Sequence, residues 1–335
     1  MLVANAAVGR PWAAHATGIL AGLAAGVTFL FGALLLTTGF QPVGTAGEFN
    51  RVAFDAAIMV TGAAAVALVA HPIRERVARV VPIDPDNPVH VLAMVLGVIL
   101  LGTQLASNLF SDVLAADQKL PQLTLGDLLS QELPLVVIAA AGIGLYMRRR
   151  PAAAAVRLGL VRPAWWQVAL ALAAAGAFFA FGQAMDALSH ALTPQVAHRV
   201  DTTAQHLFGG LGTPVGIAAL ALLPGLCEEI LFRGALQPRL GLIATALLFT
   251  SIHTQYGLSV DAASVFAIAV GLGLIRRYAN TTTSCFCHMT YNLLVGIGIS
   301  SALLGGALVA EAALIAFTAF AIWSMRRRAA LPAGP

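Results

Sequence analysis

Two adjacent glutamates interrupt a long apolar segment of the chain. Glu228 and Glu229 follow the apolar or small residues 215–227 and precede another apolar run, 230–232. Glu229 and Arg233 are spaced i, i+4, so on a helix they share a face and can form an ion pair. Glu228 lies about 100° further round the helix and has no local partner. It is therefore a candidate for proton chemistry, whereas the structural alternative is an ion-pair network that only fastens helices together.

Two histidines and an amide add to this candidate site. His253 ends an apolar run, and His288 precedes Asn292 by about one helical turn on the same face. If the chain reverses near residues 239–241, the helical rise places Glu228 about 15 Å and His253 about 18 Å from that turn. His288 is then about 12 Å in from the same side. We expect the four side chains to meet at one level of the fold.

These residue types suit hydrolysis. A carboxylate can take a proton from water while a neutral imidazole positions the same water molecule. A second imidazole and the Asn292 amide can donate hydrogen bonds to the oxyanion that forms on a carbonyl group. Such a reaction requires no serine or cysteine nucleophile.

The composition indicates a membrane setting for these residues. The chain has 335 residues, of which 59% are hydrophobic and only 10% are charged, and its mean hydropathy is +0.85. About 25% of the residues in a typical soluble domain are charged. An ordinary soluble enzyme, a disordered chain and a nucleic-acid binder are therefore excluded. We predict an all-α fold, a polytopic transmembrane helical bundle.

The apolar runs predict about 8–10 membrane spans. The least secure span begins at Glu132, and because Pro134 follows closely we expect this acid at a helix end. The predicted spans are 14–38, 52–70, 89–110, 132–147, 165–188, 214–238, 240–256, 260–275, 284–304 and 307–325.

Arginine placement predicts the orientation. Arginines cluster at 74–79, 148–150, 276–277 and 326–328, after alternate spans, whereas the loop near residue 117 is acidic. By the positive-inside rule both termini are expected in the cytoplasm. We expect a multi-pass protein of the cell membrane.

Three motifs carry a resemblance to a known family. Residues 228–233 read EEILFR, residues 249–253 read FTSIH, and residues 288–292 read HMTYN. In this order they resemble the EExxxR, FxxxH and HxxxN motifs of the CPBP family of intramembrane proteases, which includes the CAAX prenyl endopeptidases.

The resemblance implies an intramembrane endopeptidase that depends on a glutamate. Carried over by position, Glu228 would activate water with help from His253, and His288 and Asn292 would form the oxyanion site. Glu229 and Arg233 would hold the site in shape, with Phe249 packed beside it. Residues 164–325 would form the protease core, 1–163 N-terminal transmembrane helices without an assigned role, and 326–335 a basic cytoplasmic tail.

The same residues also lead to predictions about cofactors, partners and alternative functions. No cofactor is favoured; Glu228, His253 and His288 are the set that would bind zinc if a metal is used, but the chain lacks HExxH. The expected partners are a membrane-associated protein or peptide substrate and the lipid bilayer, with no nucleic acid. Two other functions stay open: a proton-coupled transporter, and a non-catalytic membrane adaptor or immunity-type factor.

Overall fold

The computed structural model describes residues 1–6, 8–39 and 50–330, and every regular element within them is a helix. This confirms the predicted all-α helical bundle. The long helices are α2 (Pro11–Thr38), α3 (Arg51–Ala67), α5 (Pro88–Phe110), α7 (Leu125–Ile143), α9 (Trp165–Leu192), α11 (Pro214–Glu229), α14 (Val260–Tyr278), α15 (Thr281–Ile297) and α16 (Ser301–Ala330).

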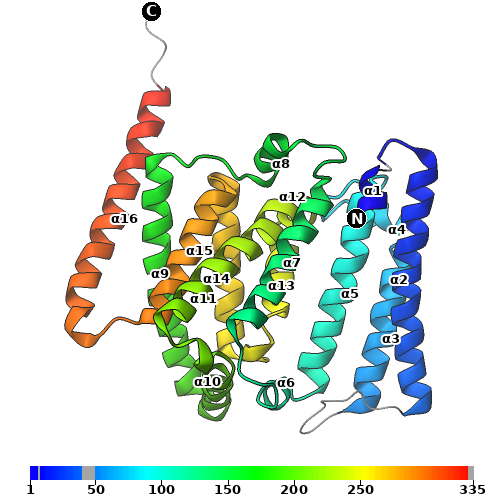
Figure 1. Cartoon of the computed structure of the whole chain (residues 1–335), viewed down its shortest axis with the longest axis horizontal. Coiled ribbons are helices and arrows are strands. Elements are labelled where there is room, and N and C mark those ends of the chain that lie inside the picture. The colour runs from blue at the N-terminus through cyan, green and yellow to red at the C-terminus, as the bar shows by residue number, and fades with distance from the viewer. Residues whose placement is uncertain (7, 40–49, 331–335) are drawn as a thin grey trace, which may run out of the picture.

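Shorter helices join these elements or cap the ends of the bundle (Figure 1). They are α1 (Leu2–Ala6), α4 (His71–Val77), α6 (Val113–Asp117), α8 (Pro151–Leu158), α10 (Pro194–Phe208), the 3-10 turn η1 (Gly209–Leu211), the π-helix η2 (Ile230–Leu236), α12 (Gln237–Leu240), α13 (Leu242–Ser251) and the 3-10 turn η3 (Thr254–Tyr256).

Six helices of the described chain are long and apolar enough to cross a membrane, and a seventh span results if the bent pair α3 and α4 is counted. The two members of that pair meet at an angle of 97°. The chain is therefore a multi-pass integral membrane protein. The six spans are Ala14–Thr38, Pro88–Phe110, Leu125–Ile143, Trp165–Leu192, Pro214–Leu240 and Ser301–Met325.

This count corrects the predicted number of about 8–10 spans, which rested on hydropathy alone. The predicted span 240–256 contains only the 10-residue helix α13 before the chain turns at η3. Helix α15 has 17 residues, and α14 carries Asp261, Arg276 and Arg277 within its 19 residues. Both helices pack against α9 in the bundle.

Helix α7 begins earlier than its apolar run suggests. The Thr124 hydroxyl oxygen accepts a hydrogen bond from the Asp127 backbone N–H, and the Asp127 carboxylate accepts one from the Thr124 backbone N–H, which is a capping box. The helix then runs through Pro134 to Ile143. The expectation that Glu132 lies at a helix end is therefore wrong. It lies in the middle of α7 and is 7% exposed.

Arginines from separate loops gather at one end of the bundle. This end, at the top of Figure 1, carries α1, α8, α12 and the end of α16, whereas α6 and α10 lie at the other end. Burial and the nearby guanidinium groups of Arg149 and Arg276 lower the pKa of Arg157 in α8. Asp112 and Asp117 flank α6 at the opposite end. Arginines are thus concentrated at one end, although Arg51 and Arg199 lie near Asp112 at the other. The cytoplasmic location of the termini stays a prediction.

Glycines bring the N-terminal helices into close contact. A Cβ atom at Gly32 of α2 would lie 2.3 Å from the Met59 nitrogen of α3, and one at Gly62 would lie 2.2 Å from the Phe29 nitrogen. Small residues at such crossings let helices pack backbone to backbone in a membrane. Further along, α5 contacts α13, and α7 contacts α11 and η2. The N-terminal half therefore packs directly on the helices that carry the sequence motifs.

Candidate active site

The acidic pair lies where α11 changes into a π-helix. α11 ends at Glu229, and η2 begins at Ile230 and continues for seven residues. Single π-helical turns are rare and occur often at functional sites, because the wider turn displaces side chains from their α-helical positions. Both glutamates and Arg233 are buried at this junction.

The Glu229 carboxylate has three side-chain partners. Its Oε1 lies 2.9 Å from Nη1 of Arg233 and 3.1 Å from Nδ1 of His288, and Ser284 donates its hydroxyl hydrogen to Oε2. A second guanidinium nitrogen of Arg233 donates to the Ala269 carbonyl at 3.1 Å. A buried charge needs such compensation. The three partners come from η2 and α15, so this carboxylate ties two elements together.

Glu228 is buried without comparable compensation. It is 6% exposed, and its Oε2 accepts no hydrogen bond from any residue that the structure describes. Two imidazole nitrogens face it: Nε2 of His253 lies 3.9 Å from Oε1, and Nε2 of His288 lies 4.0 Å from Oε2. Both distances exceed hydrogen-bond length. Carboxylate, imidazole and imidazole from three elements thus surround one small volume.

Hydrogen bonds assign the imidazole tautomers. Nδ1 of His253 lies 2.8 Å from the carbonyl oxygen of Phe249. A carbonyl can only accept, so Nδ1 carries the hydrogen, and in the neutral ring the Nε2 lone pair faces Glu228. The same argument applies to His288, whose Nδ1 faces the Glu229 carboxylate. Each ring is oriented by one nitrogen and presents the other to Glu228.

Phe249 packs at the centre of this group. Its ring centroid lies 4.6 Å from that of His253 and 5.3 Å from that of Phe232. The Arg233 guanidinium lies over the same ring, 4.3 Å from its centroid, a cation–π arrangement that gains strength when it is desolvated. Phe249 therefore supports the imidazole of His253 and the guanidinium of Arg233 at once.

Close packing of α11 on α15 brings His288 to the acids. A Cβ atom at Gly225 would lie 2.6 Å from Cγ of Met289 and 2.8 Å from its backbone nitrogen. Only glycine allows this approach without a shift of one helix. Met289 is the residue after His288, so the contact sets how near the imidazole comes to Glu228.

Asn292 lies one turn further along α15. Its amide nitrogen donates to the carbonyl oxygen of Leu220 in α11 at 3.3 Å. The side chain is partly exposed and is thus tied to the backbone of α11 rather than to Glu228. The distances place Glu228, Glu229, Arg233, Phe249, His253 and His288 in one group, with Asn292 at its edge.

A further acid reaches this group from α7. Glu132 is nearly as buried as Glu228, and its helix packs against α11 and η2, which carry the acidic pair and Arg233. Its Oε2 accepts no hydrogen bond within the described chain. Sequence reasoning missed Glu132 because the helix start was misplaced; the Thr124–Asp127 capping box would have shown a glutamate in mid-helix.

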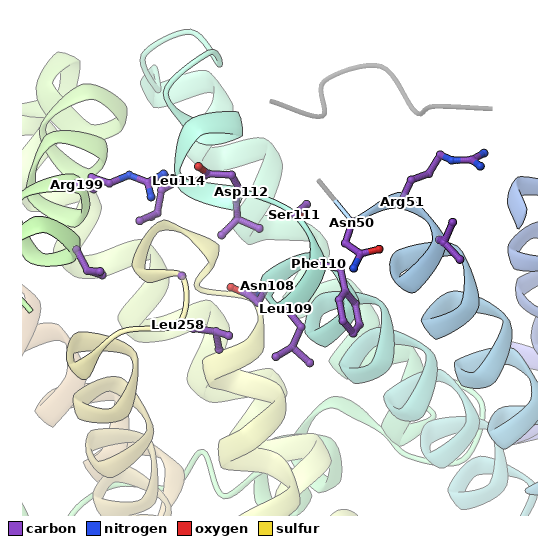
Figure 2. A pocket seen from close by; sticks show the side chains of 14 residues that line it. Asn50, Arg51, Asn108, Leu109, Phe110, Ser111, Asp112, Leu114, Arg199 and Leu258 are labelled. Atoms are coloured by element: carbon purple, nitrogen blue, oxygen red, sulfur yellow. Dashed lines mark hydrogen bonds and ion pairs between the residues drawn. The ribbon is translucent and has the colours of Figure 1, made fainter. Parts of the chain in front are cut away.

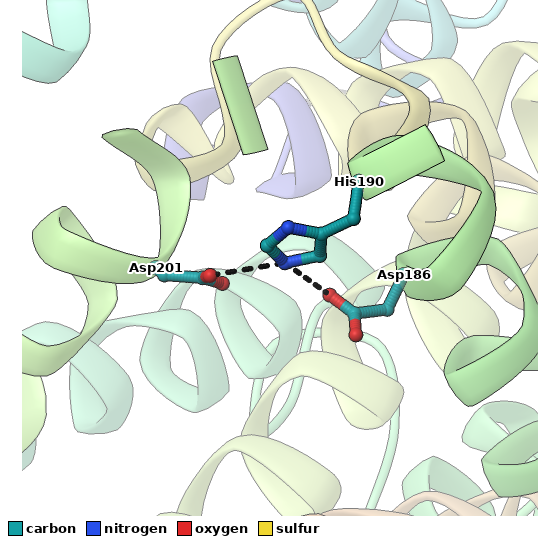
Figure 3. Close-up of side chains that lie close together, drawn as sticks. All are labelled: Asp186, His190 and Asp201. Carbon is teal, nitrogen blue, oxygen red and sulfur yellow. Dashed lines mark ion pairs between the residues drawn. The ribbon is translucent and has the colours of Figure 1, made fainter. Parts of the chain in front are cut away.

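The motif residues do not fit a three-ligand metal centre as they stand. Zinc bonds of about 2.0–2.2 Å in tetrahedral geometry require ligand atoms nearer to one another than 3.9 or 4.0 Å. In the described part of the chain, one group of three possible ligands lies within 4.8 Å, namely Asp186, His190 and Asp201 (Figure 3). There Nε2 of His190 lies 3.1 Å from Asp201 and 3.7 Å from Asp186. These partly exposed side chains pair with one another and join α9 to α10.

An open pocket of about 840 Å³ lies away from the motifs (Figure 2). The residues that line it include Asn50, Arg51, Asp112, Arg199 and Leu258. Two of them, Arg199 and Asp112, form an ion pair. No motif residue is part of its described lining. The pocket therefore contributes no side chain to the candidate site.

Comparison with known proteins agrees with the motifs. Residues 210–294 match the model of the family described as type II CAAX prenyl endopeptidase Rce1-like. The match covers 85 of 335 residues, about a quarter of the chain, and contains all three motifs. No curated protein and no solved structure matches the chain. The resemblance to the CAAX prenyl endopeptidases is thereby confirmed for this segment.

Proposed function

We propose that the protein is an intramembrane endopeptidase that hydrolyses a peptide bond of a membrane-associated protein or peptide. The observation that carries this proposal is the buried Glu228 carboxylate between the Nε2 atoms of His253 and His288, at 3.9 and 4.0 Å. It lies inside the segment that matches a CAAX prenyl endopeptidase family.

Glu228 and His253 activate water in the proposed reaction. A water molecule placed between Oε1 of Glu228 and Nε2 of His253 can donate a hydrogen bond to each, because both atoms are acceptors. Glu228 takes one proton as the water oxygen attacks the scissile carbonyl carbon. The protonated acid then gives that proton to the leaving nitrogen, and the C–N bond breaks.

His288 and Asn292 stabilise the oxyanion in this proposal. Nδ1 of His288 donates a hydrogen bond to Oε1 of Glu229, and the two atoms lie 3.1 Å apart. When Nε2 of His288 also carries a hydrogen, the Glu229 carboxylate compensates the positive charge of the ring. The imidazolium can then donate to the oxyanion through Nε2. Asn292 must exchange its hydrogen bond to Leu220 for one to the substrate. Arg233 and Phe249 hold Glu229 and His253 in place.

The proposed reaction uses no metal ion. Glu228, His253 and His288 have donor atoms that zinc accepts, but their spacing does not converge on one tetrahedral centre. A carboxylate and an imidazole activate water without a metal. We therefore expect 1,10-phenanthroline to leave cleavage unchanged; inhibition that added zinc reverses would overturn this point.

The proposed substrates are peptides held at the membrane, in the cell membrane that we propose as the location. A site formed by membrane helices meets only chains that reach it from the bilayer or its surface. Prenylated C-terminal peptides are the substrate class that the family description suggests.

Comparative proteomics of membrane fractions tests the proposal. Cells that contain the wild-type protein should yield a cleaved membrane peptide that is missing with Glu228→Gln. Glu311→Gln is the matched control, because Glu311 is also an acid in a membrane helix but lies on α16, against Gly176 of α9. Products that persist in the Glu228 variant would contradict the proposal, and proton-coupled uptake in proteoliposomes would favour a transporter instead.

A further inference from the structure

Glu132 is a buried acid near the site that lies outside both the motifs and the matched segment. It belongs to α7, which packs against both α11 and η2. The side chain is 7% exposed, and its Oε2 accepts no hydrogen bond from the described residues. A carboxyl group in such surroundings has a large solvation cost unless a partner compensates it. Glu132 therefore needs a partner that the helix α7 does not supply.

Glu228 has the complementary need. Its Oε2 also lacks a hydrogen bond in the described chain, and α11 packs directly against α7. Arg233, a buried cation of this site, is already paired with Glu229 at 2.9 Å. A buried carboxyl group that no cation compensates is better accommodated in its neutral, hydrogen-bonded form, so one of the two is expected to hold a proton.

Six other ionisable groups of the described chain interact with Glu132 or Glu228. Cys227 interacts with both carboxyl groups, and Tyr256 stacks on His253 with ring centroids 6.4 Å apart. The groups that interact with the pair are Cys227, Glu229, Arg233, His253, Tyr256 and His288.

We infer that Glu132 is a positioning residue for Glu228: its carboxyl group carries a proton and donates it in a hydrogen bond to the Glu228 carboxylate. The inference rests on the proposed function. The hydrogen bond holds Oε1 of Glu228 toward His253 and stabilises the single negative charge of the pair. The N-terminal half of the chain then supplies a functional side chain to the site as well as packing.

The inference predicts a specific pattern of substitutions. Glutamine has nearly the size of glutamic acid and donates through its amide, so Glu132→Gln preserves the hydrogen bond. Leucine fills a similar volume but cannot donate. A purely structural carboxyl group would give the opposite order, because leucine is well tolerated in an apolar helix interface.

Infrared spectroscopy of the purified full-length protein tests the protonation directly. At neutral pH, Glu132→Gln should remove a C=O stretching band of a protonated carboxyl group. Asp127→Asn on the same helix is the control, because Asp127 is an exposed cap carboxylate and should remove none. A Glu132→Gln spectrum that retains every such band would overturn the inference. This test requires no substrate.

Kinetics test the positioning role. The probe is a fluorescence-quenched farnesylated peptide with a CAAX terminus. Glu132→Leu should lower kcat about 100-fold with little change in KM, because a misplaced base mainly affects the chemical step. Glu132→Gln should retain most of the wild-type kcat. A Glu132→Leu variant with wild-type kcat, or a Glu132→Gln variant as weak as Glu132→Leu, would overturn the inference.

The two tests separate this inference from the proposed function. A wild-type protein that does not cleave the probe contradicts the proposed function for this substrate class, and the infrared band still decides the state of Glu132. A cleaving wild type whose Glu132 variants behave as wild type leaves the protease standing and removes only the role of Glu132. Melting temperatures of all variants identify any loss of folding.

Discussion

Two sides of the junction between α11 and η2 can be compared. On one side, Glu229 forms an ion pair with Arg233 and accepts hydrogen bonds from Ser284 and His288, and these side chains are all buried. On the other side, Glu228 faces two imidazoles at about 4 Å and has an oxygen without a hydrogen bond in the described chain. The two acids are neighbours in sequence, and both are buried.

This difference suggests a structural role for Glu229 and a chemical role for Glu228. A carboxylate that a cation and two hydrogen-bond donors already hold is stabilised as an anion and is a poor acceptor for a water proton. A carboxylate with open lone pairs in a desolvated place can accept one. The Glu229 side is suited to fix the geometry of α11 and α15, and the Glu228 side is suited to chemistry. The predictions below run from the largest expected effect to the smallest.

Glu228→Gln should reduce peptide cleavage by about 10³-fold or more, since it removes the proposed base. The melting temperature should stay at or above the wild-type value, because a neutral amide is less costly to bury than an unpaired carboxylate. Cleavage assays and thermal unfolding of the same detergent-solubilised samples measure both. A variant that loses both cleavage activity and thermal stability would show that Glu228, like Glu229, has a structural role.

Arg233→Ala should destabilise the protein by about 3–5 kcal/mol, because it leaves the buried Glu229 carboxylate without its cation. Unfolding in a denaturing detergent measures this change. Arg277→Ala is the control: this exposed arginine on α14 should change stability by less than about 0.5 kcal/mol. Equal effects of the two substitutions would show that the Glu229 ion pair adds nothing.

Gly225→Ala should cost about 1–3 kcal/mol, since the added methyl group meets Met289 and forces α11 and α15 apart. The shift moves His288 away from both acids, so cleavage should fall as well. Gly26→Ala on α2 is matched in chemistry, and its Cβ would have no atom within 4 Å. It should leave cleavage unchanged. Equal activity in both variants would contradict the role of this crossing.

Asp127 provides the smallest effect and a reference carboxylate. The Asp127 carboxylate accepts hydrogen bonds from the hydroxyl and the backbone nitrogen of Thr124 at the start of α7. Asp127→Asn should weaken these bonds, because an amide oxygen is a weaker acceptor than a carboxylate. The melting temperature of the detergent-solubilised variant should therefore be slightly below that of wild type. A variant with the melting temperature of wild type would contradict this cap.

Much of the architecture could be predicted from local patterns. Hydropathy predicted the helical bundle, and the i, i+4 spacing predicted the pair of Glu229 with Arg233, which the structure contains at 2.9 Å. The number of spans was overestimated, because hydropathy does not register the turn at η3 or the polar ends of α14. The middle of α7 was misplaced, because the apolar run begins after the capping box that starts the helix.

The sequence by itself determined that the chain enters a membrane and which ionisable groups it takes there, since residue type and spacing along one helix are enough for both. The spacing also indicated that Glu229 pairs with Arg233 and that Glu228 has no partner on its own helix, but only the tertiary structure decided which side chains from other helices contact each acid. Ser284, His288 and Glu132 come from helices remote in sequence from Glu228 and Glu229. Their approach depends on how helices cross, as at Gly225, and no local pattern encodes that distance.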